Sequence, residues 1–100
     1  MPTKRRPPRV THETVNVAFS LPAAVDAGDV ALCGDFNNWS PTATRLKRGK
    51  DRVWRVTIQL QKGNSYRYRF LLDGSNWEND WSADDYVRNP HGTDDSVVNV

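Results

Sequence analysis

The residue types that most often perform catalysis are few in this sequence and lie far apart along it. The carboxylates closest in sequence are two adjacent pairs, Asp84-Asp85 and Asp94-Asp95. A hydrolase needs an acid/base pair and a nucleophile or activated water that converge on one pocket. Because neighbouring side chains of an extended chain point to opposite sides, these pairs are expected to be solvated turn residues. We therefore predict a protein that is not an enzyme, and we assign no catalytic residue.

The residues that could bind a metal or a cofactor also lack the spacing that such a site needs. His12 and His91 are far apart, and neither has a second histidine or a cysteine at metal-ligand spacing. Cys33 is the single cysteine, so the chain has neither an intramolecular disulfide nor a thiolate cage. Nothing beside Cys33 in the sequence would activate its thiol, and inert packing is expected. We predict no metal and no cofactor.

Two tryptophans occupy positions that a hydrophobic core does not require. Trp39 lies in an Asn- and Ser-containing turn, and Trp77 follows the Asp73-Gly74 turn at the end of an apolar segment. An exposed indole offers a flat apolar platform, and a rim of Asn, Ser, Thr and Asp offers hydrogen bonds. A sugar ring needs both. The alternative is that each ring packs its own loop, and the residues alone leave these two interpretations open.

Alternation of apolar and polar residues predicts the elements that must position these side chains. Strands are expected within residues 15–21, 29–36, 44–47, 51–60, 65–74 and 96–100. Residues 61–64 are expected to form a hairpin turn, and residues 75–95 a long loop. No segment shows a helical stripe. Several short strands separated by turn residues indicate an all-β protein, a β-sandwich.

The same alternation assigns faces to the strands. Trp54 is expected in the core by its position in the alternation, and Val30 and Leu32 are expected to share one face. In residues 65–74 the outward positions are expected to be Arg67, Arg69 and Leu71.

Length and composition fit one ordinary globular domain. The chain has 100 residues, of which 37% are hydrophobic and 26% charged, with a net charge of +2. No apolar run approaches the roughly 20 residues that cross a bilayer, and the first residues lack a secretory signal. We therefore expect a cytoplasmic protein with no membrane partner.

Positive charge is concentrated at the N-terminus and in the middle of the chain. Residues 1–9 contain four Lys/Arg and three prolines and are predicted to be a disordered basic tail before a domain of residues 10–100. Between Arg45 and Arg69 there are nine Lys/Arg and one acid. A single-stranded nucleic-acid binder is thus an alternative. It is disfavoured because residues 10–100 carry ten basic and twelve acidic residues, and because no aromatic nucleic-acid motif is present.

Three ordered segments carry a family resemblance over about residues 10–100. VALCGDFNNWSP at 30–41 resembles the V-x-L-x-G-x-F-N-x-W segment of carbohydrate-binding module family 48. YRYRFLLDG at 66–74 and NPHGTDDSVVNV at 89–100 resemble its later strand and its closing loop and strand. That family includes the early-set domains of isoamylases and glycogen branching enzymes. It also includes the glycogen-binding domain of the AMP-activated protein kinase β subunit.

The resemblance implies an immunoglobulin-like early-set β-sandwich that binds α-1,4-glucan, as glycogen, starch or a maltooligosaccharide, without catalysis. The carbohydrate-binding residues that it implies are Trp39, Arg69, Trp77, His91, Thr93 and Asp95. The expected role is a stand-alone adaptor whose protein partner would be a glucan-metabolising enzyme or a kinase. Some members instead pack beside a catalytic barrel without binding sugar, which is the second alternative.

Several positions depart from the family pattern. His91 and Asp95 replace Leu and Asn of the closing loop, and a carboxylate accepts hydrogen bonds but does not donate them as an amide does. One additional residue precedes Trp77, which is expected to turn its ring away from the sugar. Trp81 stands where many members have proline and is expected to cover the end of the sandwich, the alternative being a further platform.

Overall fold

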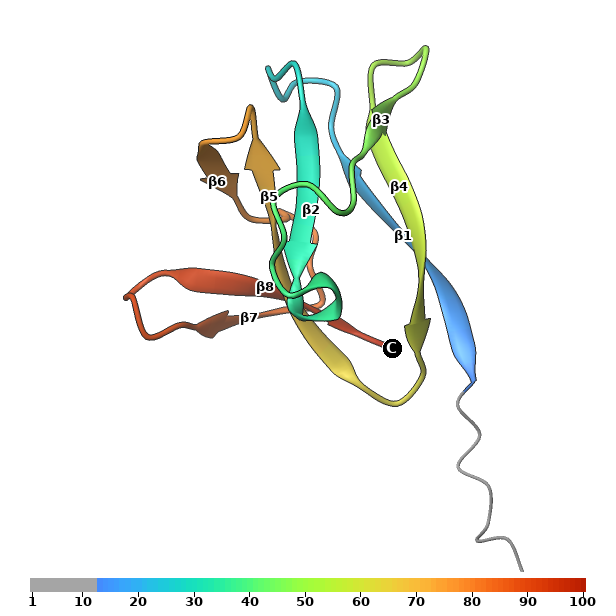
Figure 1. Cartoon of the computed structure of the whole chain (residues 1–100), viewed down its shortest axis with the longest axis vertical. Coiled ribbons are helices and arrows are strands. Elements are labelled where there is room, and N and C mark those ends of the chain that lie inside the picture. The colour runs from blue at the N-terminus through green and yellow to red at the C-terminus, as the bar shows by residue number, and fades with distance from the viewer. Residues whose placement is uncertain (1–12) are drawn as a thin grey trace, which may run out of the picture.

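Two antiparallel β-sheets face each other in the computed structural model, which describes residues 13–100 (Figure 1). The all-β sandwich expected from the sequence is confirmed. The predicted tail, residues 1–9, and His12 lie outside the described residues. Within residues 13–100 no helix is long and apolar enough to cross a membrane.

The strands follow one another in short steps along the chain. They are β1 (Thr14–Leu21), β2 (Val30–Gly34), β3 (Lys47–Arg48), β4 (Trp54–Gln61), β5 (Ser65–Leu72), β6 (Asn76–Glu78), β7 (Asp85–Arg88) and β8 (Asp94–Asn99). A 3-10 turn, η1 (Asp35–Asn37), follows β2. One sheet has the order β1-β4-β3, and the other has the order β2-β5-β8-β7, with β6 added to the end of β5.

The segment before β3 joins the two sheets. Leu32 N donates to Thr44 O at 2.8 Å, and Leu46 N donates to Val30 O at 2.9 Å, so this segment pairs with β2. Directly afterwards, β3 pairs with β4 in the other sheet. The predicted edge strand at 44–47 is therefore divided between the sheets, because the chain crosses from one to the other at this point.

The core between the sheets follows the predicted alternation. Its most buried side chains include Phe19, Leu21, Val30, Leu32, Trp54, Leu60, Tyr68 and Phe70. The Phe19 and Tyr68 rings meet edge to face with centroids 4.9 Å apart. The Tyr68 hydroxyl donates to Asp80 Oδ2 at 2.6 Å, and burial together with this bond raises the pKa of Tyr68.

The prediction of one long loop over residues 75–95 is wrong. This segment contains β6, which pairs with β5, and β7, which pairs with β8. Both strands are short and lie at sheet margins where most of their side chains are exposed. A strand that buries neither face shows no apolar alternation, so the sequence pattern did not reveal it.

A second, smaller apolar cluster lies on the outer face of the five-stranded sheet. Ala31, Cys33 and Leu71 are buried there, and Trp39 packs over them. The Cys33 thiol donates to Ser40 O at 3.2 Å, and burial raises the pKa of that thiol. Cys33 therefore remains protonated at neutral pH, as its expected packing role requires. This cluster is the floor on which the candidate site is built.

Candidate functional site

A cleft of about 520 Å³ lies on this outer face and brings the six predicted site residues together. They come from the turn after η1, from β5, from β6, and from the β7–β8 loop with the start of β8. Its lining consists of Trp39, Arg69, Trp77, His91, Thr93 and Asp95, with Asp35, Arg67, Asn89 and Pro90, which the sequence had not singled out.

Two indole rings form the apolar walls of the cleft. The Trp39 and Trp77 ring centroids are 6.4 Å apart, and the ring planes meet at 62°. Trp77 lies on β6 opposite Leu71 and is 48% exposed. The additional residue before Trp77 has therefore not turned its ring away from Trp39. The two rings give the cleft an angled rather than a flat apolar surface.

The turn that carries Trp39 is fixed by its own sequence. Asn38 and Trp39 both have a φ of 56°, the left-handed region that Asn tolerates well. Asn37 donates through Nδ2 to Leu32 O at 2.8 Å and accepts from Gly34 N at 3.1 Å. The Trp39 Nε1 group donates to Asp35 Oδ1 at 3.1 Å, which fixes the tilt of the ring.

Gly34 is the position in this turn where a side chain does not fit. An added Cβ would lie 2.6 Å from Arg67 O and 2.8 Å from the ring of Phe36. Since Trp39 N donates to Gly34 O at 2.9 Å, this close approach also sets the distance between Trp39 and the sheet.

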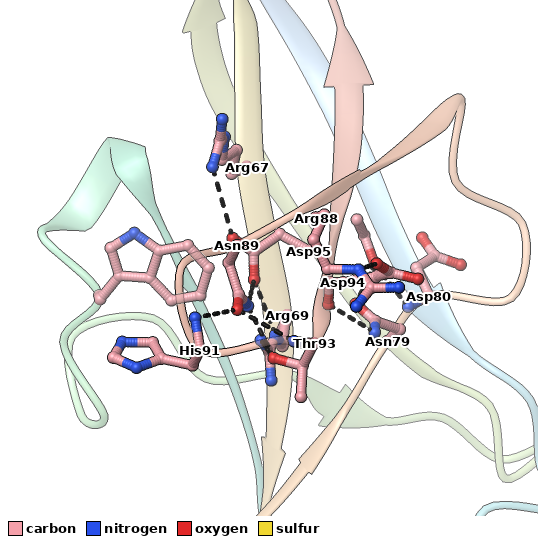
Figure 2. Close-up of polar contacts among 12 residues, drawn as sticks. Arg67, Arg69, Asn79, Asp80, Arg88, Asn89, His91, Thr93, Asp94 and Asp95 are labelled. Atoms are coloured by element: carbon pink, nitrogen blue, oxygen red, sulfur yellow. Dashed lines mark hydrogen bonds and ion pairs between the residues drawn. The ribbon is translucent and has the colours of Figure 1, made fainter.

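The polar half of the cleft is a connected hydrogen-bond network (Figure 2). Arg69 donates through Nε to Asp95 Oδ1 at 2.9 Å and through Nη2 to Thr93 Oγ1 at 2.7 Å. Asn89 donates through Nδ2 to Thr93 Oγ1 at 2.7 Å and to Asp95 Oδ1 at 3.1 Å. The Arg67 Nη1 atom lies 3.9 Å from Asp95 Oδ2, so Asp95 neutralises charge from two guanidinium groups.

Asp95 lies deeper than a sugar-contacting loop residue would. It belongs to β8 and is only 6% exposed, and its Oδ1 atom accepts from both Arg69 and Asn89. The substitution of Asp for the family's Asn thus places a charge where it pairs with Arg69. In this arrangement Asp95 positions the guanidinium group.

The network leaves Thr93 with a hydroxyl hydrogen to donate. A hydroxyl oxygen has two lone pairs and one hydrogen, and both lone pairs of Thr93 Oγ1 receive bonds, from Arg69 and Asn89. Arg69 Nη1 makes no hydrogen bond to another described residue. Together they offer a ligand two hydrogen-bond donors beside the indole walls.

Asn89 is one of the site residues that sequence reasoning missed. It is 8% exposed, and its Oδ1 accepts from His91 N at 2.9 Å and Thr93 N at 3.2 Å. This is an Asx turn, for which the Asn89-Pro90 pair was the available signal. Asn89 holds the loop so that exposed His91 and Thr93 face the cleft.

Other candidate groups lie elsewhere. Asp94 pairs with Arg88 at 3.2 Å on the surface, and both Asp84 and Asp85 are exposed. Residues 13–100 contain no group of three or more His, Cys, Asp or Glu that could hold a metal ion. Trp81 does not line the cleft, and the expectation that it covers the end of the sandwich is not met, since its side chain stands in solvent.

Comparison with known proteins gives a match in the same region. A family model described as carbohydrate-binding module 48 (isoamylase N-terminal domain) matches residues 10–87. A 1,4-alpha-glucan branching enzyme, GlgB, from Synechocystis sp. is 36% identical over 56 residues. That alignment covers 55% of this chain and 7% of the enzyme, so the similarity concerns a small part of the enzyme's length.

Proposed function

Because the chain belongs to the carbohydrate-binding module 48 family, we propose that residues 10–100 form a non-catalytic module that binds α-1,4-linked glucan. The ligand would be glycogen, starch or a maltooligosaccharide. The name of the similar enzyme, a 1,4-alpha-glucan branching enzyme, supports this ligand class. The observation that carries the proposal is the angled pair of indoles beside two free hydrogen-bond donors.

The shape of the cleft suits a chain that turns. Successive glucose rings of an α-1,4-linked chain are inclined to one another, whereas those of a β-1,4-linked chain form a flat ribbon. Walls at 62° can each stack against a different ring of a turning chain. If a flat β-1,4-linked chain lay against Trp39, no sugar ring would stack on Trp77.

The polar groups complement the edges of such a chain. Thr93 Oγ and Arg69 Nη1 donate toward hydroxyl or ring oxygens, and Asp95 and Asn89 hold both donors in place. Two platforms and a few neutral contacts provide about 4–8 kcal/mol, which corresponds to a Kd between micromolar and millimolar. Such weak binding suits a module that keeps a long polymer near a glucan-metabolising enzyme.

The nucleic-acid alternative receives less support from this cleft. Arg67 and Arg69 line it together with Asp35 and Asp95, so the positive groups already have negative partners. A phosphate chain would have to compete with those carboxylates.

Sedimentation with glycogen and calorimetry with β-cyclodextrin test the proposal. Trp39→Ala and Trp77→Ala should each weaken binding by at least about 5-fold, because each loses a stacking surface worth roughly 25 cal/mol per Å². Val15→Ala, which removes an exposed apolar side chain on β1, is the matched control and should bind like the parent. Folded Trp39→Ala and Trp77→Ala proteins that both keep parental affinity would show that the cleft is not the binding site.

A further inference from the structure

Trp81 is the most exposed large hydrophobic side chain of the described residues. It is 66% exposed, compared with 48% for Trp77, and it lies in the loop between β6 and β7. A solvent-exposed indole adds little burial free energy to folding, so packing of the domain does not explain why Trp81 is at this position.

The loop around Trp81 is nevertheless well fixed. Asp80 N donates to Ser96 Oγ at 2.9 Å, and the Asp80 carboxylate accepts from Ser82 N at 2.9 Å and from the Tyr68 hydroxyl at 2.6 Å. The loop is therefore tied to the buried core of the sandwich at the residue directly before Trp81.

The ring itself is also held. Trp81 Nε1 donates to Glu78 Oε1 at 3.0 Å, as Trp39 Nε1 donates to Asp35 Oδ1 at 3.1 Å. Each indole thus has its polar atom bound to a nearby carboxylate, while Trp39 is half-buried and Trp81 is exposed. A ring oriented in advance loses little conformational entropy when a ligand stacks on it.

A groove of about 300 Å³ runs beside Trp81. From its own loop the groove takes Asp80, Trp81 and Ser82, and from the three-stranded sheet and the loops beside it Ala18, Ser20, Leu21, Pro22 and Val53. The small side chains of Ala18 and Ser20 leave space next to the indole. Hydroxyl and carboxylate groups lie along the same groove, so it combines one apolar platform with a polar rim.

This groove is separate from the cleft between Trp39 and Trp77. The two share no lining residue. Trp77 lies on the outer face of the five-stranded sheet, opposite Leu71, whereas the Trp81 groove includes Ala18 and Ser20 of β1 in the other sheet. Two ligands can therefore occupy them independently.

We propose that the Trp81 groove is a second binding site for the same α-glucan, so that one module holds two glucan segments. The identity of the ligand rests on the proposed function, but the site rests on its own geometry. Hydroxyl groups of a sugar would donate to the carboxylate of Asp80 while a ring stacks on Trp81.

A protein partner fits this surface less well. Two carboxylates adjoin the indole: Glu78 accepts from its Nε1 group, and Asp80 lines the groove beside it. The centre of a stable protein interface is depleted of charge and buries about 800 Å² on each partner. One indole within an acidic rim does not supply that, whereas a hydroxylated ligand needs acceptors of this kind.

Two sites on one module change how it binds a polymer. When one glucan segment is held at the cleft, neighbouring segments of a glycogen particle are present at high effective concentration near the groove. The parent should then bind glycogen more tightly than it binds a short oligosaccharide.

The test uses 5-fluorotryptophan protein, in which each indole gives its own fluorine NMR signal. Single Trp→Phe variants assign the signals, and maltoheptaose is the ligand, with cellohexaose as the β-linked control. We expect the Trp81 signal to shift along a saturable curve with its own Kd. The buried Trp54 should not move, since it is only 5% exposed.

Variants separate the two sites. In the Trp39→Ala/Trp77→Ala protein the Trp81 shift should persist with an unchanged Kd. In Trp81→Ala the Trp39 and Trp77 shifts should keep their Kd while glycogen sedimentation weakens about 3- to 10-fold, and Val15→Ala should match the parent. Preserved near-ultraviolet circular dichroism confirms that each variant is folded.

Each outcome decides one of the two hypotheses. A Trp81 signal that stays fixed while Trp39 and Trp77 saturate overturns the second site and leaves the proposed function standing. The second site is also overturned, and the proposed function left standing, if the Trp81 shift vanishes in the Trp39→Ala/Trp77→Ala protein. Movement of Trp81 alone supports the groove and refutes the cleft, and four motionless signals refute both. If Trp81→Ala kept parental binding to glycogen but lost binding to another protein, the groove would be a protein-binding surface and the proposal would be overturned.

Discussion

Thr93 shows how a buried neighbour decides what a surface residue offers. Its oxygen is saturated as an acceptor by Arg69 and Asn89, so the hydroxyl hydrogen is directed away from both. A threonine that only lay on the surface of the loop would need neither the hydrogen bond from Arg69 nor the one from Asn89. The direction of this one hydrogen follows from Asp95, which holds the same Arg69 and Asn89 side chains.

Replacing the hydroxyl of Thr93 tests this role. Thr93→Val keeps the shape but removes the hydroxyl hydrogen that Thr93 would donate to the ligand, and a lost hydrogen bond of this kind costs about 1–2 kcal/mol. We expect maltoheptaose affinity to fall roughly 5- to 30-fold by calorimetry. Thr93→Ser retains the hydroxyl and should remain within about two-fold of the parent. Parental affinity in Thr93→Val would mean that the ligand does not use this donor.

Between β3 and β4, a turn residue gives a measurable pH dependence. The hydrogen bond from Arg55, followed by that from Val53 N, lowers the pKa of Asp51 from 3.8 to about 2. A carboxylate whose pKa is depressed by folding stabilises the folded state above its ordinary pKa. That contribution is lost as the pH falls from about 4 toward 2.

Carboxyl-carbon NMR titration measures this directly. We expect a midpoint near pH 2 for Asp51 and a return toward 3.8 in Arg55→Gln. An Asp51 midpoint that does not respond to Arg55→Gln would contradict the assigned cause.

At the end of β2, Gly34 links packing to the site. Gly34→Ala places a Cβ against the backbone of Arg67 and the ring of Phe36, and such overpacking costs about 1–3 kcal/mol. The control is Gly28→Ala, whose Cβ would lie 3.5 Å from Asp73 Oδ1, an ordinary contact. We expect urea unfolding to show the loss for Gly34→Ala and little change for Gly28→Ala. Equal free energies of unfolding in the two variants would show that η1 adjusts to the added methyl group without a loss of stability.

The sequence could reveal only those elements that have two different faces. Strands β1, β4 and β5 alternate because one side meets the core, and all three were predicted. β1 begins one residue before its predicted start, β4 begins three residues after its predicted start, and β5 ends two residues before its predicted end. Strands β6 and β7 are short and mostly exposed, so their side chains carry no such pattern. Trp39 was found because it lies in a turn, and Trp77 because it follows the Asp73-Gly74 turn, although it belongs to β6. Asn89 and Arg67 were missed because their roles arise only when β5 and β8 lie side by side.

Across the whole molecule, the distribution of charge separates sugar binding from polyanion binding. From Arg45 to Arg69 basic residues predominate, whereas from residue 73 onward seven acids accompany one Arg. Binding of a phosphate chain by several Lys and Arg releases counterions and weakens steeply with salt, but stacking on an uncharged sugar does not.

Salt titration of the full chain and of a protein lacking residues 1–9 therefore tests the function of the whole molecule. We expect glycogen affinity to change less than about two-fold between roughly 50 and 300 mM salt, because stacking and neutral hydrogen bonds release no counterions. Removing residues 1–9 takes away four positive charges, so any weak oligonucleotide adsorption should fall while glycogen affinity stays the same.

Sedimentation measures the glycogen affinity, and fluorescence anisotropy of a labelled oligonucleotide measures the oligonucleotide adsorption. Glycogen binding that disappears at high salt, or an oligonucleotide that binds the shortened protein more tightly than maltoheptaose does, would identify a polyanion-binding protein instead.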